Sequence, residues 1–188
     1  MRVSKAEMEK SHERIVANAA RLVRKRGIER TSVADVMHEA GLTHGGFYRH
    51  FKTKDELVRA AMESAFEEVI GVIETRFERD EPEAAILGFE EHYLSKGHVQ
   101  HPEMGCPVAA LGADVGREPG GAKKAFGEGV KRLIDALAKG MRGTKQERRQ
   151  QAARELAMLA GAVIIARASD GETANAVLAA CRRGNPSA

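Results

Sequence analysis

The sequence predicts an all-α fold. Its 188 residues are 43% hydrophobic and 30% charged, with 4% aromatic residues and no Trp, which is typical of a soluble helical protein. Apolar residues recur at three- and four-residue spacings, and no run alternates apolar and polar residues as half-buried strands do. The chain is long enough for a substantial core, in one large domain or two small ones. We expect about nine helices.

Basic residues are concentrated near the N-terminus. Residues 1–54 hold 12 Lys and Arg against 6 Asp and Glu, a net charge of +6, whereas residues 55–188 carry −3. A basic module on a slightly acidic body suggests a polyanionic partner such as nucleic acid. The same excess also fits an ordinary solvated surface, so charge alone leaves the partner open.

Three helices are predicted in this basic module. The first covers residues 5–26 and has an apolar face. The second begins after Thr31 or Ser32, either of which can cap it. The third is short, covers residues 44–51 and has Thr43 as its N-cap. Helix, short helix, turn and short helix is the layout of a helix-turn-helix.

The third helix, in the segment LTHGGFYRHF, contains two adjacent glycines. Each internal glycine costs a helix roughly 0.5–1 kcal/mol relative to alanine. Phe47 and Phe51 have the spacing of one buried face and would hold the segment on the core. Gly45 and Gly46 would then remove side chains where a large partner approaches the backbone.

The rest of the chain is predicted to be helical. Thr53 and Glu56 form a capping-box pattern at the start of a long helix. Residues 96–107 contain two prolines and two glycines, and we expect them to be irregular. The expected helices cover residues 54–79, 82–96, 108–115, 122–141, 145–168 and 171–182.

Several classes of protein are disfavoured. The N-terminus has no apolar core of signal-peptide type, and the most apolar stretch, residues 156–166, is too short to span a bilayer. Two distant cysteines, Cys106 and Cys181, do not make a disulfide framework. We therefore expect a cytoplasmic protein with no membrane partner.

A family resemblance is carried by Ala20, Gly27, residues 31–36 (TSVADV) and residues 40–57 (AGLTHGGFYRHFKTKDEL). The Tyr-x-x-Phe-x-x-Lys-x-x-Leu spacing within them is specific, and the match covers about a quarter of the chain. Through these residues the sequence resembles the tetracycline-repressor (TetR) family of bacterial transcription regulators. The resemblance implies a three-helix DNA-binding domain at residues 1–53 and a helical ligand-binding and dimerisation domain at residues 54–188.

The resemblance also implies a double-stranded DNA operator and a role for each matching residue. The start of the third helix would contact bases and phosphates, and Tyr48 would pack on a thymine methyl group or donate to a phosphate. Arg49 could bind guanine or a phosphate, and both alternatives stay open. The expected DNA-binding residues are Thr31, Ser32, Thr43, His44, Gly45, Gly46, Tyr48, Arg49, His50 and Lys54.

In the C-terminal part, the resemblance implies a homodimer and an unknown small-molecule effector, apolar or electrophilic, that releases a repressor from a palindromic operator. The expected interface is formed by residues 145–168 and 171–182, which could instead close the core of the monomer. Each expected effector-binding residue could also be an ordinary core residue: Met62, Phe66, Phe89, His92, Tyr93, Cys106, Leu111 and Met141.

Cys106 admits two interpretations. It precedes a helix that starts near Pro107, and a helix N-terminus lowers the pKa of a thiol, as in a redox or electrophile sensor. It could equally be a small buried packing residue. The nearby histidines have no zinc-binding spacing, and no set of nucleophile, base and orienting group is present, so we expect no metal, no cofactor and no catalytic site.

Overall fold

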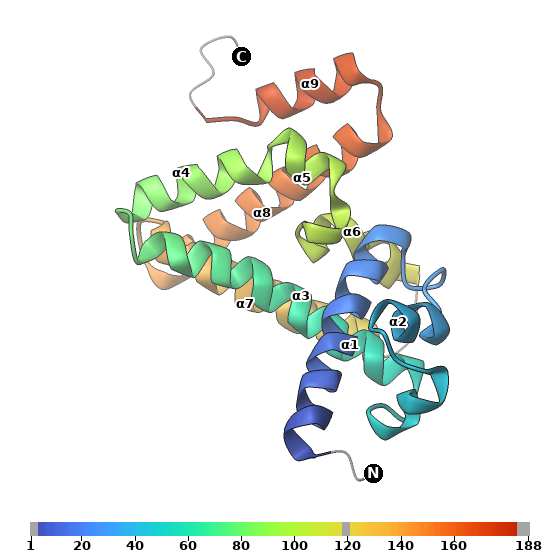
Figure 1. The fold of residues 1–188 in the computed structure, drawn as a ribbon. Coiled ribbons are helices and arrows are strands. Elements are labelled where there is room, and N and C mark those ends of the chain that lie inside the picture. Colours follow the sequence, from blue (N-terminus) through green and yellow to red (C-terminus); the bar gives the residue numbers. More distant parts are fainter. Residues whose placement is uncertain (1–3, 118–120, 184–188) are drawn as a thin grey trace.

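The computed structural model describes residues 4–117 and 121–183, and within them it contains helices and no strand (Figure 1). The all-α prediction is confirmed. The α-helices are α1 (Lys5–Arg26), α2 (Val33–Glu39), α3 (Lys54–Phe77), α4 (Pro82–Tyr93), α5 (Lys96–Gln100), α6 (Pro107–Arg117), α7 (Gly121–Leu137), α8 (Lys145–Ala168) and α9 (Gly171–Ala180). Three 3-10 helices join them: η1 (His44–Arg49), η2 (Pro102–Met104) and η3 (Ala138–Gly140).

The long helix α3 connects the two ends of the molecule (Figure 1). Its first turns pack on α1 beside α2 and η1, and α7 lies alongside it. α4 packs on the other half of α3, while α8 packs on α7 and carries α9. A continuous apolar core therefore extends from the N-terminal helices to the last ones.

Two predicted segments differ in detail. The third helix is a 3-10 helix, because two glycines give little helix propensity and only six residues separate Thr43 from His50. Residues 96–107, expected to be irregular, contain α5 and η2, because Ser95 caps α5 by accepting a hydrogen bond from the amide of His98. The cap at Ser95 thus stabilised a helix in this segment despite its glycines and prolines.

The packing of α3 on α7 depends on a glycine. Gly129 of α7 is buried, and a Cβ atom placed on it would collide with the ring of Phe66, which is itself fully buried on α3. The absence of a side chain at Gly129 therefore sets how near the two helices lie.

A buried arginine links the N-terminal helices to the rest of the chain. Arg24 is one of the basic residues in the last turn of α1, yet it is buried. Its guanidinium donates to the carbonyls of Ala20 (2.9 Å) and Gly105 (3.0 Å) and pairs with Glu68 of α3 (2.7 Å). These three bonds compensate the burial of its charge and hold η2 and Gly105 against α1.

The segment that contains Gly105, residues 98–109, is held from its other side by α8. Arg167 donates to three backbone carbonyls, those of His98 (2.8 Å), Val99 (3.1 Å) and Ala109 (3.2 Å). The His98 ring bridges the carbonyl of Tyr93 through Nδ1 (2.6 Å) and accepts from the amide of Cys106 through Nε2 (2.9 Å). Burial lowers the pKa of His98 to about 4, so the ring is neutral at pH 7, as this pattern requires.

None of the helices in the described part of the chain has the length and apolarity needed to cross a bilayer.

We predict that Gly129→Ala destabilises the fold by about 1–3 kcal/mol, because the new methyl group forces α7 away from Phe66. Gly127→Ala is the matched control, since a Cβ atom at Gly127 on the same helix meets nothing within 4 Å. The control should stabilise the protein by roughly 0.5–1 kcal/mol through helix propensity. Urea denaturation followed by circular dichroism measures both, and equal effects would contradict the packing argument.

Candidate nucleic-acid interface

The predicted third helix is anchored by two aromatic rings. Phe47 and Phe51 are buried, and their ring centroids lie 5.8 Å apart. The ring of His12, on α1, stacks on Phe51 at 4.8 Å between centroids. The carbonyl of Phe47 accepts hydrogen bonds from the amides of His50 (2.8 Å) and Phe51 (3.0 Å), which close the last turn. The short helix is therefore fixed by the core despite its weak propensity.

The opposite face of η1 is exposed to solvent. Thr43, His44, Gly45, Tyr48 and Arg49 are all exposed, and Tyr48 has 69% of its surface accessible. The Tyr48 ring packs edge-on against the rings of His44 and Phe47. These contacts hold the ring in place while most of the side chain stays in solvent. An exposed aromatic of this kind suits contact with a partner.

Thr43 stands at the N-cap position, as predicted, but its side chain makes no capping hydrogen bond. The expectation that its hydroxyl caps this helix is therefore wrong. The hydroxyl stays available on the surface beside the two glycines.

The two glycines are not required by the fold itself. Neither has a positive φ angle. A Cβ atom at Gly45 would meet nothing within 4 Å, and one at Gly46 would make only an ordinary contact with Met37, 3.5 Å away. Their presence at a place where alanine would fit is consistent with a requirement from outside the chain.

The flanking residues differ in what they offer. Ser32 is exposed and caps α2, accepting from the amide of Asp35 (3.1 Å) and donating to its carboxylate (2.7 Å). Lys54 lies at the first position of α3, with Nζ 3.4 Å from the carbonyl of Glu29. His50 is half-buried, and burial together with His12 and Arg49 lowers its pKa. A predominantly neutral His50 would serve as a hydrogen-bond donor rather than a cation.

Thr31 corrects the predicted set. It is only 2% exposed, and its hydroxyl donates to the carbonyl of Gly27 at 2.8 Å. Thr31 therefore stabilises the turn between α1 and α2 and is not available to DNA in this conformation.

Six of the predicted effector-binding residues lie in the closed core: Met62, Phe66, Phe89, Tyr93, Cys106 and Leu111. His92 is exposed. Met141 lines a cavity that the sequence did not predict. The structure thus does not bring these residues together around one open pocket.

Cys106 does not have the environment predicted from its place before a helix. Complete burial raises the pKa of the Cys106 thiol. The Tyr93 hydroxyl and backbone amides of α6 lower the pKa by less, so the net shift is upward. A buried neutral thiol is a poor nucleophile. Cys181, in contrast, is half-buried at the C-terminal end of α9.

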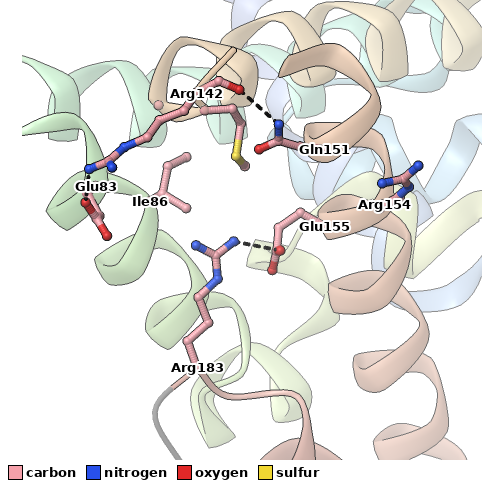
Figure 2. A pocket seen from close by; sticks show the side chains of 9 residues that line it. Glu83, Ile86, Arg142, Gln151, Arg154, Glu155 and Arg183 are labelled. Carbon is pink, nitrogen blue, oxygen red and sulfur yellow. Dashed lines mark hydrogen bonds and ion pairs between the residues drawn. The ribbon is translucent and has the colours of Figure 1, made fainter. Parts of the chain in front are cut away.

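The cavity beside Met141 lies between α4, η3, α8 and the chain after α9 (Figure 2). Its volume is about 360 Å³, and its lining residues are Glu83, Ile86, Gly140, Met141, Arg142, Gln151, Arg154, Glu155 and Arg183. Arg142 pairs with Glu83 (2.9 Å), and Arg183 pairs with Glu155 (2.8 Å). No sequence pattern indicated this site, because four separate segments contribute to it.

Within the described residues, no group of three or more His, Cys, Asp or Glu side chains is arranged to hold a metal ion.

The N-terminal residues match a known family. The sequence profile of bacterial regulatory proteins of the tetR family matches residues 15–61. The HTH-type transcriptional regulator TtgR of Pseudomonas putida is 40% identical over 67 residues, which are 36% of this chain and 32% of TtgR. An uncharacterized HTH-type transcriptional regulator of Mycobacterium tuberculosis is 31% identical over 113 residues, covering 59% of this chain and 56% of that protein. These alignments span from about a third to just over half of the relatives' lengths.

Solved structures extend the likeness of the fold to the whole chain. The reduced form of NemR from E. coli has a TM-score of 0.76 at 20% identity, covering 95% of this chain and all of NemR. A TetR-family regulator from Cytophaga hutchinsonii has a TM-score of 0.74 at 21% identity, covering 97% of this chain and 95% of that one. These relatives and neighbours are regulators rather than enzymes. Residues 15–61 match the tetR family of bacterial regulatory proteins, and the fold of the whole chain is similar to that of a solved regulator of this family.

Proposed function

We propose that this protein is a cytoplasmic transcriptional repressor that binds a palindromic DNA operator as a homodimer and is released by a small-molecule effector. The observation that carries the proposal is the exposed face of η1, where two glycines that the fold does not need lie beside Tyr48 and Arg49. The DNA-binding unit comprises residues 1–53, and residues 54–188 form the regulatory unit.

The proposed contacts to DNA are of two kinds, to base edges and to phosphates. With no side chains at Gly45 and Gly46, the backbone of η1 approaches the major groove, and Tyr48 and Arg49 reach base edges or the adjacent phosphates. Lys54 and Ser32 bind phosphates at the N-termini of α3 and α2, where unpaired amides favour anions. Thr43, His44 and His50 complete the contact surface.

The homodimer is supported by an unpartnered apolar face on α8. Ile164 and Ile165 are each 46% exposed, and Met158 is also exposed. A Cβ atom at Gly161, one turn before Ile165, would meet nothing within 4 Å, so the helix is bare there and can approach another closely. A second copy of α8 covers this face, with α9 beside it, and the resulting two-fold axis matches a palindrome.

The link between effector and DNA passes through residues 98–109. Arg167 holds this segment to α8, and Arg24 holds it to α1. A ligand that displaces the segment would change the position of α1 and hence the separation of the two DNA-binding units. An electrophile would reach Cys106 only when the segment opens, because the thiol is fully buried.

Selection of bound sequences from a random DNA pool tests this function. We expect the enriched sites to be two-fold symmetric and the affinity for them to fall steeply with salt, because lysine and arginine contacts release counterions. Equal affinity for selected and random DNA at physiological salt would refute the proposed function.

Lys54→Ala serves as a control within this experiment. It should weaken binding to all sequences alike and reduce the magnitude of the salt slope by about one, since it removes one phosphate contact. Lys124→Ala, which alters an exposed lysine on α7, should change neither quantity.

We predict that Gly45→Ala lowers operator affinity at least about tenfold, because a methyl group separates the backbone of η1 from DNA, while thermal stability is unchanged or increased. Gly71→Ala is the matched control, as its Cβ atom also meets nothing within 4 Å but lies on α3. Fluorescence anisotropy with the selected operator measures affinity. Unchanged affinity in Gly45→Ala would remove the proposed role of the glycine.

We predict that Ile165→Asp converts the homodimer to a monomer, because it places an uncompensated charge in the apolar interface. Sedimentation velocity at micromolar concentration measures the change. Leu87→Asp is the control, since Leu87 is similarly exposed but lies on α4. A variant Ile165→Asp that sediments as the unmodified protein does would place the interface elsewhere.

A further inference from the structure

Beside the cavity of Figure 2, two buried carboxylates share one guanidinium. Glu90 of α4 is 2% exposed, and the side chain of Glu155 on α8 is also largely buried. Nη2 of Arg183 lies 2.9 Å from Oε1 of Glu90 and 2.8 Å from Oε2 of Glu155. One cation therefore faces two anions of the core.

The hydrogen bonds of this cluster are incomplete. Arg183 is aligned as a donor to Glu155 but only lies at ion-pair distance from Glu90. Both carboxylate oxygens of Glu90 and Oε1 of Glu155 are buried and accept no hydrogen bond from the described residues. A buried carboxylate without donors is costly, so the cluster has a surplus of acceptors that a ligand with N–H donors can satisfy.

The electrostatics agree with this surplus. Burial, and then the charge of Glu155, raise the pKa of Glu90 to about 7, although Arg183 acts in the opposite direction. The single cation in the cluster thus does not balance both carboxylates. The missing component is positive charge or a hydrogen-bond donor.

Of the three side chains in the cluster, Arg183 is the one that a ligand can most readily displace. It lies in the chain just after α9, and its side chain is 47% exposed, whereas Glu90 and Glu155 are held on long helices. Arg183 and Glu155 both line the cavity, and Figure 2 shows the hydrogen bond between them. Ile86 and Met141 contribute apolar surface to the same cavity.

We propose that this cavity binds a compact organic cation, an amidinium, guanidinium or primary ammonium group on a small apolar body, which donates to Glu155 and Glu90 in place of Arg183. The volume of about 360 Å³ is within the range of small-molecule sites. Of the two other lining arginines, Arg142 is already paired with Glu83 and Arg154 is exposed to solvent, so the rim adds little attraction for an anion. The ligand's apolar body lies against Ile86 and Met141.

The test uses benzamidine as the cation, benzamide as its neutral isostere and benzoate as the anion. Isothermal titration calorimetry of the full chain at pH 8, without DNA, should show benzamidine binding at least about tenfold more tightly than either of the others. Because no DNA is present, the result is independent of whether the protein is a repressor.

Variants assign the binding to the cluster. Glu155→Gln keeps the shape of the side chain and should weaken benzamidine at least about tenfold, whereas Arg183→Ala should tighten it by removing the internal competitor. Glu67→Gln, which alters an exposed carboxylate on α3 outside the cavity, is the control and should change the affinity by no more than about twofold.

The pH dependence gives a second readout. The charged groups around this cluster are Glu155 and Arg183 and, farther out on the cavity lining, Glu83, Arg142 and Arg154. Glu90 is the carboxyl that takes up a proton near pH 7. Benzamidine stays charged throughout, so its affinity should fall about tenfold from pH 8 to pH 6, following the deprotonated fraction of Glu90.

The opposite results are equally clear. Equal binding of benzamide would make the cavity a neutral apolar site, and preferred binding of benzoate would make it an anion site; either overturns the proposal. So does Arg183→Ala without a gain in affinity. Should a variant unfold, the comparison of benzamidine with benzamide on the unmodified protein still decides.

Discussion

The contact between the Phe66 ring and the bare backbone of Gly129 determines how closely α3 and α7 pack, and the rest of the fold is arranged around that pair. α3 begins at Lys54 beside the candidate DNA-binding face and continues through the core of the C-terminal part. One helix therefore packs on α1 and also on α4 and α7. This arrangement places the proposed regulatory part in direct contact with the proposed DNA-binding part through α3.

A polar connection supplements this apolar one. Arginines from both sides hold the carbonyls of the segment around His98 and Gly105. Charge-assisted hydrogen bonds to backbone are strong when buried but are lost together when one partner moves. The segment is therefore held to α1 through Arg24 and to α8 through Arg167.

The candidate DNA-binding face was largely predictable because its signals are local. These signals are the residues that begin and end helices, the spacing of Phe47 and Phe51, and the paired glycines, which all lie close together in the chain. The exposed residues follow from periodicity. Thr31 was misassigned, because the neighbouring hydroxyl of Ser32 could cap the same helix and only the backbone geometry of Gly27 decides which one turns inward. Cys106 was ambiguous for a related reason, since a helix N-terminus lowers the pKa of a thiol while burial raises it, and burial cannot be read from a Gly-Cys-Pro motif.

By itself, the sequence determined the all-α class, most helix boundaries to within a few residues and the exposed face of η1, because capping residues and apolar periodicity act over one or two turns. Only the tertiary structure decided that Arg24 is buried, that Glu90 and Glu155 share Arg183, and that a cavity forms beside them. Those residues come from segments far apart in the chain, and no local rule specifies which charged side chains will face one another once the helices pack.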